Sequence, residues 1–311
     1  MALTLTEAAK FSRNMLRRGV IEEIIRDSVV LQKLPFMDVT GNAYEYMVEE
    51  ALAGAAWYDP NEVWSESTGS WAKRTAQLRI LGGDADVDNF LKATRSDLND
   101  LRAEVVSNKT KAVKHTFLDA FYYGSNTANP KQFSGLQVLT AAAQRISLGS
   151  GTTPAALSVA RLEEAMDLVL DGQPDVVIMT RKMKRLLNTY IRSTGSGTGL
   201  PPSQFFQRIG EIAGVPVAID DFITNTELLA SGVYSAKTGG TNTTSIHIVR
   251  FGSQDVTGFQ NGGLTVRQVS KDLESKDGER VRIKWYVSLG IIRTFSNAIV
   301  DGINTATAVV A

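Results

Sequence analysis

The chain has 311 residues, of which 43% are apolar, and this length and composition can build one large domain or two ordinary ones. Its 33 basic and 33 acidic residues cancel. A dedicated nucleic-acid binder usually carries a clear basic excess, because neutralising phosphates supplies much of its affinity. The balanced charge therefore argues against tight DNA binding as the main activity, and it lowers the repulsion between identical copies.

Cysteine is absent, which excludes disulfides, thiol catalysis and cysteine-based metal sites and fits a reducing cytoplasm. The only histidines are His115 and His247, so a multi-histidine metal site is nearly excluded. The first residues show no secretory signal, and no apolar run is long enough to cross a bilayer. We therefore expect a soluble, intracellular protein with no metal, no cofactor and no membrane contact.

The N-terminal residues read as an amphipathic arm. Thr6 is the expected N-cap of a helix that runs to about Arg18, and an apolar stripe at helical spacing continues beyond Gly19 in a second short helix. Such an arm cannot bury its stripe alone. We expect it to lie on its own body or on a neighbour.

Residues 34–72 contain no Lys or Arg, and they hold three of the four tryptophans. The acidic residues of this stretch are Asp38, Glu45, Glu49, Glu50, Asp59, Glu62 and Glu66. Residues 43–49 predict one strand and residues 72–81 its return, with Gly54, Pro60 and Gly69 in the irregular tip between them. We call the whole extended segment, residues 37–88, the tongue.

An isolated hairpin is marginal in water, and exposed aromatic side chains make it worse. The tryptophans can be the core of a small subdomain, but the segment has too few periodic apolar residues for that, so we favour an interface with another copy. An acidic tongue also predicts a basic receiving surface, for which the helix at 181–192 is a candidate, although a basic run of this kind is usually a solvated helix face. The predicted inter-subunit contacts are Tyr44, Tyr46, Trp57, Tyr58, Trp64, Trp71, Lys73, Arg74, Arg181, Lys182, Lys184 and Arg185.

A long helix is predicted from the Ser96 N-cap to Gly124, roughly 40 Å at 1.5 Å per residue. We call it the spine helix. Its expected apolar face comprises Leu98, Leu101, Val105, Ala112, Val113, Phe117 and Phe121.

A compact α/β pattern follows the spine helix. Its predicted elements are a helix at 158–170, a strand at 176–179, a basic helix at 181–192, a loop at 193–202, a strand at 214–219, a loop at 236–244 and a strand at 245–251.

The last third of the chain is predicted to be β-rich. Residues 264–269 alternate, and residues 279–295 alternate over roughly 55 Å. Val281, Ile283, Trp285, Val287, Leu289 and Ile291 are expected on one face, and Arg280, Arg282, Lys284, Tyr286 and Ser288 on the other. A long helix and a long strand predict an elongated platform.

No catalytic, cofactor or metal site can be assembled from the sequence. The glycine-rich run at 195–199 lacks the preceding strand and following helix of a phosphate loop. Asp220 and Asp221 are better explained as a solvated turn than as a cation site. His115 is expected on a solvated or subunit-facing surface, and His247 on the outward face of its strand. No Gly-x-Ser-x-Gly elbow is present.

The order of these elements resembles the major capsid protein of tailed bacteriophages, whose fold is shared with encapsulin nanocompartments. The local carriers of the resemblance are Arg18-Gly19-Val20-Ile21-Glu22, Phe133-Ser134-Gly135-Leu136, Asp175-Val176-Val177-Ile178-Met179 and Ile212-Ala213-Gly214-Val215-Pro216-Val217. The resemblance implies an α+β capsid fold with an N-terminal arm, an extended β-hairpin loop, a peripheral domain with a long spine helix and long strands, and an α/β axial domain.

The resemblance also implies a division of the chain. The arm would be 1–36, the extended loop 37–88 would overlie a neighbour, the peripheral domain would be 89–135 with 257–295, and the axial domain 136–256 with 296–311. One of the loops Ser193–Pro202 and Ala236–Thr244 would line the fivefold and sixfold centres. Some relatives link subunits covalently through a loop lysine; Lys73 is the only lysine of the tongue, but no asparagine partner can be named.

The expected function is a non-enzymatic shell subunit of the virion. It would assemble in the host cytoplasm as hexamers and pentamers into an icosahedral head around double-stranded DNA. Expected partners are copies of itself, a separate scaffolding protein, a portal, a decoration protein and, non-specifically, the packaged DNA. The alternatives are an encapsulin-like compartment that encloses cargo and, from a different class, a soluble α/β enzyme or small-molecule-binding protein.

Overall fold

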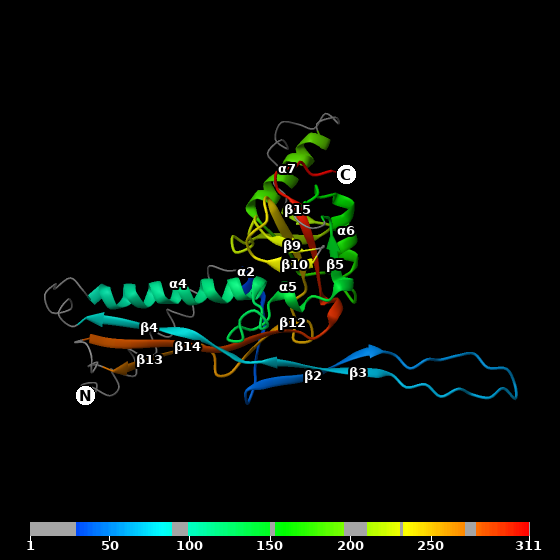
Figure 1. Ribbon diagram of the computed structural model, residues 1–311, viewed down its shortest axis with the longest axis horizontal. Helices are drawn as coiled ribbons and strands as arrows, with labels where there is room; N and C mark the ends of the chain where they lie inside the picture. Colours follow the sequence, from blue (N-terminus) through cyan, green and yellow to red (C-terminus); the bar gives the residue numbers. More distant parts are fainter. Residues whose placement is uncertain are drawn as a thin grey trace, which may run out of the picture.

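The computed structural model describes residues 29–88, 99–149, 153–195, 210–230, 233–270 and 278–310. An elongated lower layer carries a compact upper domain, and a thin hairpin projects from the lower layer past the rest of the molecule (Figure 1). Residues 1–28 of the predicted arm, the Ser96 cap and Leu98 lie outside the described residues. So do residues 196–202 of the loop predicted after the basic helix.

The lower layer is a five-stranded sheet built around one long strand, β14 (Gly278–Ile291). Strand β4 pairs antiparallel with β14 along one edge, while β12 and then β13 pair antiparallel with it along the other. Strand β1 runs parallel to β12 beyond that edge. The bounds are β1 Phe36–Asp38, β4 Arg79–Asp88, β12 Val256–Gln260 and β13 Thr265–Ser270. Helix α2 (Val29–Lys33) precedes β1.

The spine helix α4 (Asn99–Tyr123) lies along one face of this sheet (Figure 1). Its buried side chains pack with the apolar face of β14, and the ring centroids of Phe117 and Trp285 are 4.9 Å apart. The predicted apolar face is confirmed at Val113, Phe117 and Phe121, but Ala112 is exposed and was assigned to it wrongly. Ala112 lies about 100° around the helix from Val113, which places it on the exposed side. The side chains of Leu101 and Val105 lie outside the described set.

The alternation predicted for β14 is confirmed from Arg280 to Val287, where buried and more exposed side chains follow one another. The strand ends at Ile291, four residues before the predicted end, and a 3₁₀ turn follows at Thr294–Ser296. Ser288, predicted on the open face, is buried. It pairs in register with Phe259, and the ring of Tyr44 from the tongue stacks on Phe259 at 4.7 Å, so the tongue covers this part of the face.

The upper domain is a six-stranded mixed sheet in the order β5-β15-β11-β6-β8-β7. The strand bounds are β5 Arg145–Ser147, β6 Val176–Met179, β7 Glu211–Ile212, β8 Val215–Ile219, β11 Thr243–Val249 and β15 Asn297–Asn304. The predicted strands at 176–179, 214–219 and 245–251 are all present. A small hairpin of β9 (Leu228–Ala230) and β10 (Val233–Ala236) and two short helical segments, α5 (Leu136–Leu139) and η1 (Ala142–Gln144), complete the domain.

The upper sheet is buried on both faces. Helices α6 (Val159–Asp167) and α7 (Arg181–Gly195) cover one face, where Val177 and Met179 of β6 pack with them. Val176 and Ile178, which point the other way, join the core that includes the end of the spine helix. Both faces of the sheet therefore require apolar or fully hydrogen-bonded side chains.

We predict that Phe117→Ala lowers the free energy of unfolding of the isolated subunit by about 3–5 kcal/mol, because the ring is fully buried between the spine helix and β14. Urea unfolding followed by circular dichroism measures the change. The matched control is Thr116→Ala, one position along on the exposed side, for which we expect a change within about 0.5 kcal/mol. Equal losses in the two variants would contradict the packing described.

Candidate assembly interface

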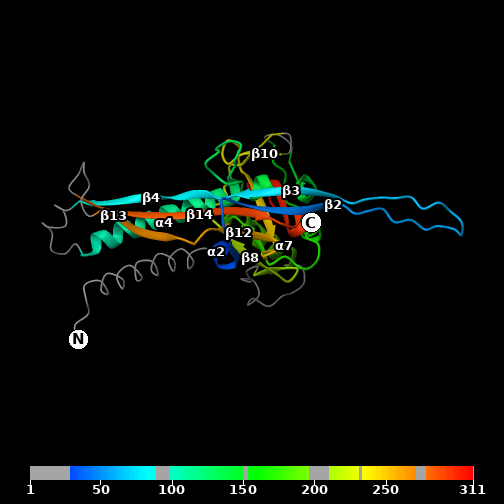
Figure 2. The same ribbon diagram turned by 90° about the horizontal axis from the view of Figure 1, so that it is seen from below.

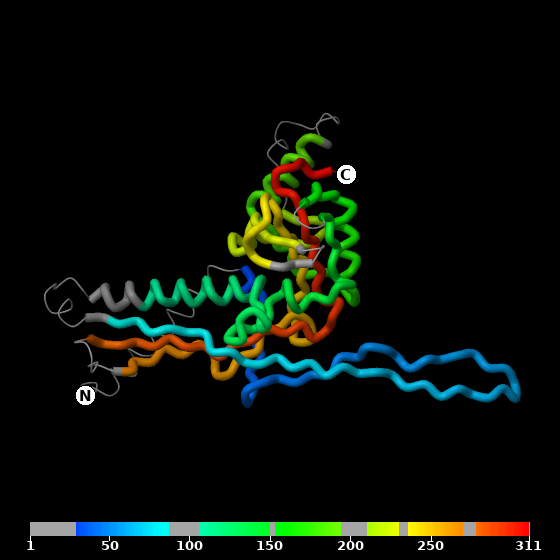
Figure 3. Tube along the Cα trace, viewed as in Figure 1, coloured from blue at the N-terminus to red at the C-terminus, as the bar shows by residue number. Residues whose placement is uncertain are grey.

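The projecting hairpin consists of strands β2 (Ala43–Ala51) and β3 (Ser70–Gln77). They pair antiparallel from Ala43 opposite Gln77 to Ala51 opposite Ser70. Residues 52–69, the tongue tip, continue beyond the paired strands into open space (Figure 3). The predicted first strand is confirmed, but the predicted return at 72–81 is divided at Leu78: β3 belongs to the hairpin, and β4 joins the sheet of the lower layer.

The tongue tip exposes large apolar side chains. Trp57 is 102% exposed, Val63 89% and Trp64 77%. A two-stranded hairpin has no second layer against which to bury them. Large apolar side chains that are exposed together on one segment mark an interaction site in a soluble protein.

Local contacts give the tip a defined shape. The rings of Tyr58 and Trp64 stack at 4.6 Å, and the Tyr58 hydroxyl lies 3.0 Å from Oγ of Ser65. Across the turn, the backbone N–H of Asp59 donates to the Glu62 carboxylate at 2.8 Å. A shape held before contact lowers the entropy lost on binding.

Two tyrosines fix the other end of the hairpin to its own chain. The ring of Tyr44 stacks on Phe259 at 4.7 Å, and the Tyr46 hydroxyl donates to the carbonyl of Ile291 at 3.1 Å. Burial raises the pKa of Tyr46, and the charge of Arg74 opposes that shift. Tyr44 and Tyr46 were predicted to contact a neighbour; the contacts that the structure gives them are within the subunit and anchor the tongue.

The charged residues of the hairpin leave it acidic. Lys73 pairs across the strands with Glu45 at 2.5 Å, but both side chains are about half exposed, so the pair contributes little stability. Arg74 is half-buried beside Tyr46. The exposed carboxylates of Glu49, Glu50 and Glu66 outnumber these cations.

The basic run on α7, predicted as a receiving surface, is partly engaged by its own chain. Arg181 pairs with Asp221 at 3.0 Å, and Lys182 donates to Oγ1 of Thr305 at 2.9 Å. Lys184 is half-buried and Arg185 is exposed. The run is therefore not one continuous free cationic surface.

Asp220 and Asp221 turn to different partners. Asp220 accepts hydrogen bonds from the Tyr122 hydroxyl and the Phe222 backbone N–H, each at 2.9 Å, whereas Asp221 pairs with Arg181. The two carboxylates therefore do not converge on one point, and Asp220 is half-buried instead of lying in the solvated turn that was predicted. Within the described ranges, no group of three His, Cys, Asp or Glu side chains is arranged to hold a metal.

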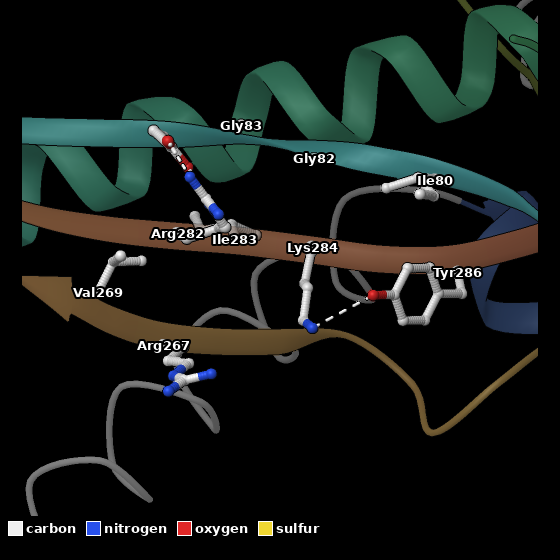
Figure 4. Close-up of a pocket in the computed structure, with 10 residues that line it drawn as sticks. Ile80, Gly82, Gly83, Arg267, Val269, Arg282, Ile283, Lys284 and Tyr286 are labelled. Atoms are coloured by element: carbon white, nitrogen blue, oxygen red, sulfur yellow. Dashed lines mark hydrogen bonds and ion pairs between the residues drawn. The ribbon is translucent and has the colours of Figure 1, made fainter.

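A basic groove lies on the lower sheet, on the face away from the spine helix (Figure 4). It encloses about 670 Å³. Its lining residues are Ile80, Gly82, Gly83 and Asp84 of β4, Arg267 and Val269 of β13, and Arg282, Ile283, Lys284 and Tyr286 of β14. We call this surface the groove. It was not found by sequence reasoning, because it forms only when three strands distant in sequence are placed in register.

Carboxylates of the same sheet neutralise two of the arginines near the groove. Arg282 binds Asp84 through two hydrogen bonds at 2.6 and 2.7 Å, and Arg280 binds Asp86 in the same way. The hydrogen bonds from Arg282 lower the pKa of Asp84. Among the residues that the structure describes, neither Arg267 nor Lys284 has a carboxylate partner. The groove therefore presents two uncompensated cations beside the exposed apolar side chains of Ile80 and Val269.

A cluster of buried polar side chains joins the spine helix to the upper sheet. Tyr123 at the end of α4 donates to Glu227, as does the Ser245 hydroxyl at 2.8 Å, and Ser245 lies 3.1 Å from Nε2 of His247. His247, predicted to face outward, is fully buried. The prediction was wrong because β11 is covered on both sides, by α6 and α7 and by the end of α4, where Tyr122 contacts the imidazole.

Ser245, His247 and Glu227 are the residue types of a catalytic triad, but their arrangement differs from one. Serine has a single proton and gives it to Glu227, so His247 donates to the serine oxygen instead of accepting from it. Nδ1 of His247 has no hydrogen-bond partner, whereas a triad histidine is oriented there by its acid. All three side chains are buried. The cluster is built to hold two parts of the fold together.

His115 is exposed on the spine helix, with its ring edge-on to Phe222 at 5.1 Å. No helix among the described residues is long and apolar enough to cross a membrane.

Comparison with solved structures identifies the fold. The chain matches the holo-SrpI encapsulin complex from Synechococcus elongatus with a TM-score of 0.64 at 17% identity, over 90% of this chain and 88% of that one. It matches a structure of Mycobacterium phage Ogopogo with a TM-score of 0.62 at 17% identity, over 88% and 91%. It matches the capsid of the native GTA particle with a TM-score of 0.59 at 15% identity, over 88% and 89%.

The chain has the capsid fold of tailed phages and encapsulins. The α+β fold class expected from the resemblance is thereby confirmed over nearly the whole chain. No family model matches the chain, and no curated protein matches its sequence. At such low identity, the likeness concerns the fold, and the contacts of this capsid fold must be argued from its own residues.

The buried cluster predicts opposing pH effects on stability. Burial raises the pKa of Glu227 from its ordinary value of 4.5 to about 7. The protonated carboxyl therefore contributes its full stability below pH 4.5, and this contribution is lost as pH rises through about 7. Burial, reinforced by the charge of Arg145, lowers the pKa of His247 to about 3. The neutral imidazole therefore contributes its full stability above pH 6.5, and this contribution is lost as pH falls toward 3.

We expect Glu227→Gln to remove the first effect. Relative to this variant, the wild-type subunit should lose about 3 kcal/mol of unfolding free energy between pH 4.5 and 7, and no more above that range. Urea unfolding of isolated subunits at several pH values gives the two curves of unfolding free energy against pH. Relative to His247→Gln, the wild-type subunit should instead lose unfolding free energy as pH falls from 6.5 toward 3. Parallel wild-type and Glu227→Gln curves would refute the assignment.

Proposed function

We propose that the chain is a shell-forming subunit, the major capsid protein of a tailed phage, which self-assembles into an icosahedral head around double-stranded DNA. The observation that carries the proposal is the tongue tip, whose apolar side chains no part of the described subunit covers. The capsid fold supports the same conclusion, because phage and GTA capsids share it. The folded subunit is thus complete only beside copies of itself.

The same proposal assigns roles to the parts of the fold. The lower layer would be the peripheral domain and the upper domain the axial one, with the boundaries given above. Helix α7 ends at Gly195 at the far end of the upper domain (Figure 1). The Ala236–Thr244 loop, by contrast, is held against the spine helix by an ion pair between Lys237 and Asp119. This contrast favours Ser193–Pro202 as the loop at the fivefold and sixfold centres.

An encapsulin-like compartment is the second candidate, because an encapsulin complex is among the structures with this fold. The content of purified particles separates the two. Double-stranded DNA inside particles supports the phage head, and a protein cargo without DNA supports the compartment. A 33.8-kDa monomer at every concentration and salt tested would contradict both and favour a soluble enzyme or binding protein.

We predict that Trp64→Ala leaves the subunit folded but raises the concentration needed for assembly. Truncation of a central interface tryptophan costs about 2 kcal/mol or more, which corresponds to roughly 30-fold for each contact. Deletion of residues 54–70 should abolish assembly. Negative-stain imaging and size-exclusion chromatography measure assembly, while circular dichroism of isolated subunits reports folding.

The matched control is Leu170→Ala, which removes an exposed apolar side chain from the upper domain and should leave assembly unchanged. Global unfolding of either tongue variant would show that the tongue belongs to the core of its own subunit. Normal assembly of the deletion variant would show that the tongue is not an interface.

A further inference from the structure

A bulge separates the two strands that follow one another along the same edge of β14 (Figures 1 and 2). Strand β12 ends at Gln260, opposite Val287. Strand β13 begins at Thr265, opposite Lys284. Four residues, 261–264, therefore lie opposite a stretch of β14 that is only two residues long. The surplus residues leave the ladder of backbone hydrogen bonds, as they do in a β-bulge.

Two glycines form the turn of this bulge. The φ angles of Gly262 and Gly263 are 70° and 69°, which glycine adopts without steric cost. The backbone N–H of Asn261 still donates to the carbonyl of Tyr286 at 3.2 Å. Beyond that bond, neither the N–H of Gly262 nor the side-chain amide of Asn261 has a hydrogen-bond partner among the residues that the structure describes. Both residues are exposed.

We propose that Asn261 is a site of spontaneous deamidation, at which an uncharged amide becomes a carboxylate without an enzyme. In the first step, the backbone nitrogen of Gly262 loses its proton to base in the solvent and attacks Cγ of Asn261. A bond forms between this nitrogen and Cγ, and the bond between Cγ and Nδ2 breaks. Nδ2 takes a proton from water and leaves as ammonia, and the chain now contains a succinimide ring.

Water then opens the ring in one of two ways. Addition at Cγ breaks the new bond and produces aspartate. Addition at the backbone carbonyl carbon of residue 261 breaks its bond to the nitrogen of Gly262 and produces isoaspartate, in which the chain continues through the side chain. On either route one water is consumed and one ammonia is released, and no electrons are transferred. The product carries one more negative charge than the starting chain.

The structure favours the first step at this position. Gly262 has no side chain, and a Cβ built on it would meet nothing within 4 Å, so the approach of its nitrogen to Cγ is open. Its N–H is outside the ladder, so no hydrogen bond must break before the nitrogen reacts. The bulge also has surplus length, so it can accommodate the additional backbone atom of isoaspartate without a shift of β12 or β13.

Other exposed asparagines lack one of these conditions. Asn61 lies in a turn with a φ of 71°, but the N–H of Glu62 after it donates to the carbonyl of Asp59 at 3.1 Å. Asn129 is followed by Pro130, which has no N–H to lose. The sequence contains no second Asn-Gly pair.

The new carboxylate lies on the groove face of the lower sheet. Asn261 is opposite Tyr286, and opposite residues of an antiparallel pair project to the same face. Tyr286 lines the groove, with its hydroxyl 3.2 Å from Nζ of Lys284 (Figure 4). Deamidation therefore places a negative charge on the face that carries the uncompensated cations Lys284 and Arg267. It reduces the positive charge of the groove as the protein ages.

Ageing of the purified full-length protein tests the site. During incubation in alkaline buffer, the peptide that contains residue 261 should gain the mass difference between an amide and an acid and separate into aspartate and isoaspartate forms. Peptides that contain Asn61 and Asn129 should stay unmodified when Asn261 is half converted. A buffer one pH unit more alkaline should speed the reaction about tenfold, because the reactive nitrogen anion becomes about tenfold more abundant. Equal conversion at Asn61 and Asn261 would overturn the proposal.

Two variants provide the controls. Asn261→Gln keeps a neutral amide but must close a larger ring, so its conversion should be at least about tenfold slower. Asn261→Asp has the charge of the product from the start. On native isoelectric focusing, aged wild-type protein should move to the position of Asn261→Asp, whereas aged Asn261→Gln should not move. The melting temperature of Asn261→Asp should lie within about 2 °C of the wild type, because the bulge is exposed.

The outcomes bear on this site alone, since isolated subunits suffice and the proposal does not rest on the shell-forming function. An acidic shift that persists in aged Asn261→Gln would assign the reaction to another residue and overturn the proposal. An isoaspartyl methyltransferase that labels aged wild type and not aged Asn261→Gln would support it, because that enzyme methylates the isoaspartate product. Failure of Asn261→Asp to fold would contradict the bulge described.

Discussion

A two-stranded hairpin has only one layer, so whatever apolar surface it carries must be covered by something outside it. This constraint governs the molecule. The hairpin is fixed at one end by Tyr44 against Phe259 and by the Tyr46 hydrogen bond, and it is shaped at the other by the stacked pair of Tyr58 and Trp64. Between these points nothing in the described subunit touches it from above or below. The hairpin is attached to its own subunit at its base, and its tip is exposed.

The lower layer is the packed base from which the hairpin projects (Figure 1). The spine helix and β14 run side by side, and the rings of Phe117 and Trp285 pack between them, so bending one element would require repacking the other. At its end, the spine helix is joined to the upper sheet through buried hydroxyls: Tyr122 to Asp220 and Tyr123 to Glu227. A buried polar group that loses its partner costs about 1–3 kcal/mol, so these bonds also restrict the angle between the two parts.

Sequence reasoning succeeded where one periodic signal decides the outcome. The alternation of β14 and the three-and-four spacing of the spine helix are local patterns, and the structure contains both. The exposure of the tongue followed from a count of its apolar residues. The order of these elements was enough to indicate the capsid fold, although no single motif was specific.

The failures have a common cause: they depend on what another segment places beside a residue. His247 alternates with isoleucines as an outward residue would, yet the end of α4 covers it. Ser288 follows the alternation of β14 until the tongue crosses that face. The return strand is divided at Leu78 because β14 offers β4 a long edge to pair with. The groove needs Arg267 and Lys284 on adjacent strands, a register that no local pattern specifies.

The anchored end of the hairpin is a small area of ring stacking and one hydrogen bond, whereas the lower layer is a large packed core. The angle at which the hairpin leaves its subunit can therefore change at this anchor without repacking of the lower layer.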